Sequence, residues 1–156
     1  MRFHLIDRIL EVDAGKKIRI VKNLSLAEEY LADHFPGFPV MPGVLMLETL
    51  VEAGAWLLRI SDDFRHSVIA LRDARNVKYG SFMEPGKTLE ATVDLEKIDT
   101  SGGEVSFRGK GECDGQATVS ARFTVARYNL ADRDPALEAV DRRLVAHWRR
   151  VYTSIR

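Results

Sequence analysis

Residues 34–48 combine a histidine, a glycine and a carboxylate at a spacing that suits acid–base chemistry. The stretch reads HFPGFPVMPGVLMLE, with His34 in a loop of three prolines, Gly43 directly after the last proline, and Glu48 five residues later. Because proline fixes the backbone and cannot continue regular structure, the loop should hold His34 in a defined place. From Pro42 onward the sequence predicts a helix, because proline is favoured at a first helical position and the following residues are apolar on nearly every side.

A helix that starts near Gly43 supplies the polarising group that such chemistry needs. The first N–H groups of a helix lack internal partners, and glycine lets a ligand carbonyl approach them closely. Glu48 lies about 7.5 Å further along the axis, at a rise of about 1.5 Å per residue. Burial in an apolar helix would raise the pKa of Glu48 and make it a proton donor, with His34 as the complementary base. The alternatives are a solvated Glu48 and a structural or exposed His34.

The same stretch resembles the active-site motif of the 3-hydroxyacyl-[acyl-carrier-protein] dehydratases, a family with the hotdog fold. The shared pattern is His-Phe-Pro-Gly-x-Pro-x-x-Pro-Gly-Val-Leu-x-x-Glu, and LIDRILEVDAGKKIRIVKNLS and IALRDARNVKYGSFMEPGKTLEATVDL extend the likeness over about residues 3–128. The resemblance implies a long central helix wrapped by a curled antiparallel sheet. It also implies a homodimer, with a higher assembly possible, whose two active sites lie at the subunit interface. His34 would then be the base, Glu48 of the other subunit the acid, and the Gly43 N–H the backbone oxyanion donor.

The reaction implied by the resemblance is dehydration of (3R)-3-hydroxyacyl thioesters to trans-2-enoyl thioesters, in fatty acid or related lipid biosynthesis. The substrate would be carried on the phosphopantetheine of acyl carrier protein or on coenzyme A, and no cofactor or metal is expected. One alternative is a hotdog acyl thioesterase, in which the helix acid activates water and His34 is not needed. Another is a non-catalytic acyl-binding or scaffold protein. The spacing of 14 residues between His34 and Glu48 favours dehydration.

Glu52 departs from the dehydratase pattern, which typically has a glutamine four residues after the acid to orient its carboxyl. Glu48 and Glu52 share one helix face at this spacing, so if both are buried their titrations should couple and one acid should stay protonated. The alternative is that Glu52 bonds to an arginine or to the backbone outside the site. The sequence leaves both readings open.

Apolar runs separated by turn signals predict about six strands around this single helix. The runs are 3–13, 16–24, 67–80, 87–98, 104–113 and 116–128. The Asp13-Ala14-Gly15 turn predicts an N-terminal hairpin, and turns such as Ser101-Gly102-Gly103 predict an antiparallel meander of the last four strands. Residues 25–30 predict one helical turn in which Ser25 and Glu28 form a capping box. The expected fold class is α+β, with the sheet curled around the helix.

The last residues predict an amphipathic helix added to this unit. Asp134-Pro135 offers an N-cap followed by proline, and apolar residues then recur at helical spacing opposite several arginines. Residues 1–130 are therefore predicted to be the hotdog domain, and 131–156 a C-terminal helical extension of it. Its apolar stripe is expected to pack on the sheet or on a partner subunit. The alternative is that its arginines bind an acidic carrier protein.

Composition limits the class of protein and of partner. The 156 residues are 46% apolar, enough for one hydrophobic core, and Lys+Arg and Asp+Glu are 23 each. This balance indicates neither nucleic acid nor an anionic membrane as the main partner. The first residues carry too many charges for a signal peptide or a membrane span, and the single cysteine suits a reducing compartment, so the cytoplasm is expected.

The remaining candidate residues are predicted to be structural. Cys113 lies in an expected strand without a catalytic signature and is predicted to be a small core residue. Met46 and Trp56 are predicted to pack in the core, with the lining of an acyl tunnel as the alternative. Three histidines lack metal-ligand spacing and are expected to be surface or structural residues: His4, His66 and His147.

Overall fold

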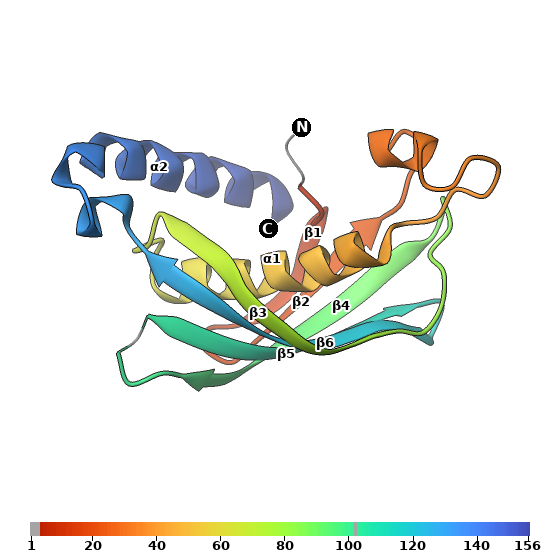
Figure 1. Cartoon of the computed structure of the whole chain (residues 1–156), viewed down its shortest axis with the longest axis horizontal. Helices are drawn as coiled ribbons and strands as arrows, with labels where there is room; N and C mark the ends of the chain where they lie inside the picture. The colour runs from red at the N-terminus through yellow and green to blue at the C-terminus, as the bar shows by residue number, and fades with distance from the viewer. Residues whose placement is uncertain (1–3, 102) are drawn as a thin grey trace.

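The computed structural model describes residues 4–101 and 103–156, in which one long helix packs on an antiparallel sheet (Figure 1). The strands are β1 (Arg8–Asp13), β2 (Lys17–Asn23), β3 (Val68–Tyr79), β4 (Thr88–Ile98), β5 (Glu104–Cys113) and β6 (Gln116–Tyr128). The helices are α1 (Gly43–Ser61) and α2 (Glu138–Ile155), with short 3-10 helices η1 (Glu29–Ala32), η2 (Leu130–Asp132) and η3 (Pro135–Leu137). The predicted α+β architecture with an added C-terminal helix is confirmed.

The strands form one open sheet in the order β1-β2-β4-β5-β6-β3, so β1 and β3 are its two edges. The predicted meander is therefore right for β4, β5 and β6 but wrong for β3, which pairs with β6 instead of β4. The reason is the segment 80–87, which crosses the end of the sheet instead of turning back on itself. Met83 is fully buried there, and its carbonyl accepts a hydrogen bond from the Met41 N–H at 2.9 Å. This crossing brings the end of β3 to the start of α1.

Apolar side chains of α1 fill the inner face of the sheet. Leu50 on the helix and Phe107 and Phe123 on the sheet are fully buried, and each such side chain contributes about 1.5–3 kcal/mol through burial. Gly54 allows the helix to lie close to the sheet, because a Cβ at this position would come within 3.0 Å of the Phe123 ring. This packing fixes α1 on the sheet, and with it the end of the loop that leads into the helix.

The C-terminal helix α2 covers the side of α1 that faces away from the sheet (Figure 1). The Trp148 and Trp56 rings meet edge to face with centroids 5.8 Å apart, and Tyr152 stacks on Trp56 at 6.1 Å. The Arg59 guanidinium lies 4.1 Å from the centroid of the Trp148 ring, a cation–π contact. We expected the apolar stripe of this helix on the sheet or on a partner subunit. Its rings meet Trp56 of α1, Phe64 after α1 and His4 before β1, and the helix also approaches the edge strand β1.

Two aspartates fix the start of α2. The Asp134 side chain accepts a hydrogen bond from the Ala136 N–H at 3.0 Å, so the predicted N-cap before Pro135 is present, at the start of η3. The buried Asp141 carboxylate accepts hydrogen bonds from the backbone N–H groups of Leu130 and Ala131 at 3.0 and 2.9 Å. It also accepts one from the Ser67 hydroxyl, which ties the helix to the residue before β3.

The N-terminal region differs from the prediction in two places. The first strand was expected over 3–13, but residue 3 lies outside the described residues and the strand begins at Arg8. Residues 4–6 leave the sheet because the Leu5 N–H donates to a carboxylate of α1, whereas the Asp7 N–H still donates to the Val21 carbonyl of β2 at 2.9 Å. The capping box is absent because the Glu28 carboxylate pairs with the buried Lys22, and the helical turn is η1, beginning at Glu29. Gly102, within an expected turn, lies outside the described residues.

Candidate active site

The loop before α1 orients His34. The His34 ring is half-buried, and its Nδ1 lies 3.1 Å from the Val40 carbonyl oxygen. A carbonyl can only accept, so Nδ1 carries a proton, and in the neutral form of the ring Nε2 is the nitrogen with the lone pair. The Val40 N–H donates to the His34 carbonyl at 3.2 Å, so the two residues are joined through both backbone and side chain. The sequence therefore builds a loop that orients the His34 ring, with Nδ1 on the Val40 carbonyl and Nε2 left to act on a ligand.

Gly43 is the first residue of α1, after Pro42 at the N-cap. The sequence predicted Pro42 at the first helical position, whereas Pro42 is the N-cap, one position before the first helical residue. The N–H groups of the first helical turn have no carbonyl partner within the helix and carry partial positive charge. A Cβ on Gly43 would lie 3.0 Å from the Cε1 and Cζ atoms of Tyr79, so the absence of a side chain lets the Tyr79 ring pack on the helix start.

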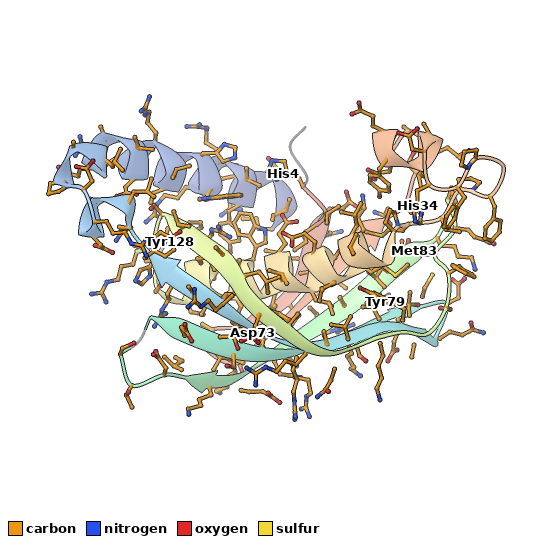
Figure 2. The ribbon with its side chains drawn as sticks, viewed as in Figure 1. His4, His34, Asp73, Tyr79, Met83 and Tyr128 are labelled. Atoms are coloured by element: carbon orange, nitrogen blue, oxygen red, sulfur yellow. The ribbon has the colours of Figure 1, made fainter. Side chains whose placement is uncertain are left out.

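His34 and Gly43 line one cavity of about 400 Å³ at the end of the molecule where α1 begins. Its walls also include Met46 from α1 and Tyr79 and Phe82 from the end of β3 and the segment after it. His34, Tyr79 and Met83 gather at this end in Figure 2, whereas His4 lies beside α2. A mostly apolar cavity with a few convergent polar groups is the usual form of a small-molecule site.

Glu48 does not line this cavity, although it is only five residues after Gly43. Its side chain is exposed and has no hydrogen-bond or ion-pair partner within the described part of the chain. Partial burial by neighbouring atoms raises the pKa of Glu48, and the nearby negative charge of Glu52 raises it further. A single chain thus brings the predicted base and backbone donor together but leaves the predicted acid facing outward.

Glu52 is held by groups outside the cavity. One carboxylate oxygen accepts a hydrogen bond from the Leu5 N–H at 2.9 Å, and the other accepts one from the Trp56 indole at 3.4 Å. Burial raises the pKa of Glu52, and these hydrogen bonds and the charge of Arg59 partly oppose the shift. The geometry agrees with the second reading of the sequence, in which Glu52 bonds to backbone outside the site. Its charge still acts on Glu48 one helical turn away.

Residues 1–122 match the family described as the FabA-like domain, which is well over half of the chain. The chain belongs to the FabA-like domain family. This span contains the loop of His34, the helix α1 and the end of β3. The helix α2 lies beyond the matched residues.

Similar proteins agree with this assignment. The 3-hydroxyacyl-[acyl-carrier-protein] dehydratase FabZ of Geobacillus thermodenitrificans is 38% identical over 134 residues, covering 84% of this chain and 87% of that protein. The FabZ of Oenococcus oeni is 38% identical over 117 residues, covering 75% and 83%. Among solved structures, the dehydratase heterocomplex ApeI:P from Xenorhabdus doucetiae superposes with a TM-score of 0.68 at 18% identity, covering 86% of this chain and 90% of that one. The expected hotdog fold is confirmed.

The other candidate residues of this FabA-like chain take structural positions. Cys113 and Trp56 are buried as predicted, whereas Met46 is buried and also lines the cavity. His66 Nδ1 contacts the Asp62 carboxylate at 2.8 Å, and the rings of His4 and His147 lie near each other with centroids 6.0 Å apart. No cluster of three or more potential metal ligands occurs in residues 4–101 and 103–156. Within the same residues, neither helix has the length and hydrophobicity required to cross a membrane.

Tyr79 and Phe82 are cavity residues that the sequence did not single out. The resemblance includes an aromatic residue before the Pro85-Gly86 turn, which was the available signal. Their place in the site depends on the crossing of segment 80–87 past the start of α1, and this crossing is a tertiary feature.

Proposed function

We propose that this FabA-like protein dehydrates (3R)-3-hydroxyacyl thioesters of acyl carrier protein to trans-2-enoyl thioesters. The observation that carries the proposal is the hydrogen bond from His34 Nδ1 to the Val40 carbonyl. It leaves His34 Nε2 free to accept a proton inside a cavity that also contains the start of α1. The relatives that are 38% identical over most of the chain are dehydratases of this kind by name, which supports the same reaction here.

In the first half of the reaction, the chain removes the C2 proton of the substrate. His34 Nε2 accepts this proton, and the electrons of the C2–H bond move toward the thioester carbonyl, whose oxygen gains negative charge. The Gly43 N–H, at the positive end of α1, donates to that oxygen and lowers the energy of the enolate. General-base catalysis and one oxyanion donor each contribute about two to three orders of magnitude in rate.

In the second half, an acid protonates the C3 hydroxyl, which leaves as water while the C2=C3 double bond forms. Glu48 suits this role because its raised pKa keeps more of it protonated near neutrality. Since Glu48 faces away from the cavity of its own chain, the acid of each site comes from a second copy, and the protein works as a homodimer. The open edge strand β3 offers backbone groups for pairing between two copies. The chemistry uses only these side chains and the substrate's own carrier arm, so it requires no further cofactor.

The test uses purified protein with a 3-hydroxyacyl carrier-protein thioester and the matching coenzyme A thioester. Enoyl absorbance and free thiol are followed separately. Enoyl product supports dehydration, whereas free thiol without enoyl product identifies a thioesterase. Retained ligand binding without either product identifies a non-catalytic acyl-binding protein.

The shared site has its own test in two variants, His34→Ala and Glu48→Gln. Each change is expected to lower kcat by two or more orders of magnitude with the fold intact. If each site takes its base from one copy and its acid from the other, mixing the two inactive variants restores one intact site per heterodimer. Activity that stays absent after verified subunit exchange refutes the shared site.

A further inference from the structure

The helix α2 has a second face that the contact with α1 leaves uncovered. The residues that face α1 include Trp148 and Tyr152, which pack against the core. On the neighbouring face, Val140 and Leu144 are half-buried and lie one helical turn apart, together with His147. These residues and the N-terminal segment line a groove of about 550 Å³. We call this the α2 groove; its lining residues include His4, Val140, Arg143, Leu144, His147 and Arg150.

The α2 groove is cationic although the chain as a whole is neutral. The two acids of α2 are already engaged, since Asp141 is buried against backbone N–H groups and Glu138 pairs with Arg142 at 2.7 Å. In contrast, Arg143 and Arg150 are exposed and form no ion pair within residues 4–101 and 103–156. Two unpaired arginines and two histidines beside apolar residues form a surface that complements an acidic, partly apolar partner.

The α2 groove lies next to the acid of the proposed reaction. His4, at one wall of the groove, precedes Leu5, whose N–H donates to Glu52 at 2.9 Å. Glu52 is one helical turn, about 6 Å, from Glu48. The cavity that holds His34 has no lysine or arginine among its lining residues. The cavity and the α2 groove share no lining residue, so the place of chemistry and this cationic surface are separate.

We propose that the α2 groove is a docking surface for the acidic carrier domain that bears the acyl group, with Arg143 and Arg150 as the main contacts. This inference rests on the proposed function for the identity of the carrier. A carrier bound here presents its flexible pantetheine arm from the side of α1 on which Glu48 is exposed. A second copy of the chain is the weaker candidate for occupant, because a two-fold contact through this surface brings two cationic patches together. The docking surface lies on α2, outside the residues that match the FabA-like domain.

The experiment compares the double variant Arg143→Glu/Arg150→Glu with a matched control. The control, Arg108→Glu/Lys110→Glu, makes the same charge change on β5, on the far side of the sheet, where both side chains are more than half exposed. Each protein is assayed with one acyl chain on two carriers, acyl carrier protein and free pantetheine. The kcat/KM for the carrier-protein substrate divided by that for the pantetheine substrate is expected to fall at least about tenfold in the groove variant. The same ratio is expected to stay unchanged in the control. The difference between wild type and groove variant should shrink at high salt.

Binding of fluorescently labelled acyl carrier protein, followed by anisotropy, tests docking without turnover. If the wild type forms no enoyl product from either substrate, the proposed function fails, while weaker carrier binding by the groove variant alone still supports the docking surface. Equal binding by the wild type and both variants overturns it. The groove variant is also examined by sedimentation. If its oligomeric state changes while the ratio of the two kcat/KM values does not, the docking proposal is refuted and the groove is a contact between copies.

Discussion

Replacing Gly43 with alanine should lower the activity while leaving the stability of the fold almost unchanged. The added Cβ would lie 3.0 Å from Cε1 and Cζ of Tyr79 and 3.2 Å from Cδ1. Ordinary carbon contacts are about 3.5–4.0 Å, so the Tyr79 ring has to move by several tenths of an ångström. The ring is 49% exposed and therefore free to move outward. The same ring lines the cavity of His34, so its displacement changes the wall against which the substrate lies.

The stability of the Gly43→Ala variant should change little. Alanine in place of glycine in a helix gains about 0.5–1 kcal/mol, because glycine loses more backbone entropy on folding. Overpacking against Tyr79 costs about 1 kcal/mol, at the low end of the usual range because the ring is half-exposed. The two effects oppose each other, so the net change is within about 1 kcal/mol. For a domain of this size, that is a shift in Tm of about 2–4 °C at most.

The activity of the same variant should fall by about tenfold to a hundredfold in kcat/KM. The methyl group and the displaced ring restrict the approach of the thioester carbonyl to the first N–H of α1, and misplacement by about 1 Å costs about a hundredfold. Enoyl absorbance and thermal unfolding are measured on one preparation. Val44→Ala is the control, because Val44 is the next residue of α1 and is 69% exposed. Turnover within twofold of wild type would refute the role of Gly43, and a large fall in Tm would refute the free movement of Tyr79.

Two further changes test the face of α1 opposite the sheet. Glu52→Gln removes the negative charge that helps to raise the pKa of Glu48, so the alkaline limb of the kcat profile, where the acid loses its proton, should move to lower pH. The distant Glu90→Gln is the control, and a limb that does not move would show that Glu52 has no influence on catalysis. Trp148→Ala removes the contacts with Trp56 and Arg59 and should cost about 2–3 kcal/mol, less than for a fully buried tryptophan. Thermal unfolding measures this loss, and an unchanged Tm would mean that α2 contributes nothing to the stability of the core.

Local patterns were sufficient to predict the bounds of β2 to β6. The residues of β5 alternate between exposed and buried, and this period of two is visible in the sequence. The bounds of β3 to β6 therefore agree with prediction to within about one residue, the scatter expected at element ends. The pairing of β3 was not predictable in the same way. It depends on the burial of Met83 in the crossing segment, which requires α1 and the sheet to be in place first.

The candidate site shows the same division. The loop of His34 is a local structure fixed by prolines and by the His34–Val40 hydrogen bonds, so the fixed place of His34 beside the start of α1 could be predicted from one stretch of sequence. Tyr79 enters the cavity from a strand far away in the chain, and no local pattern distinguishes it from other aromatic strand residues. Glu52 was ambiguous because its partner, the Leu5 N–H, comes from a segment that the alternation of residues predicted to be a strand.

The charged residues of α1 explain why an acid occurs in so apolar a helix. Glu48, Glu52 and Arg59 lie on one face of the helix, at spacings of four and seven residues, away from the sheet. The N-terminal segment provides a donor for Glu52 through Leu5, and α2 covers Arg59 with the Trp148 ring. Of these three charged residues, only Glu48 is exposed and without a hydrogen-bond or ion-pair partner among the described residues. Since the chain covers the other two charges and leaves this one open, the proposed function requires that the His34 loop of a second copy meets the acid at this position.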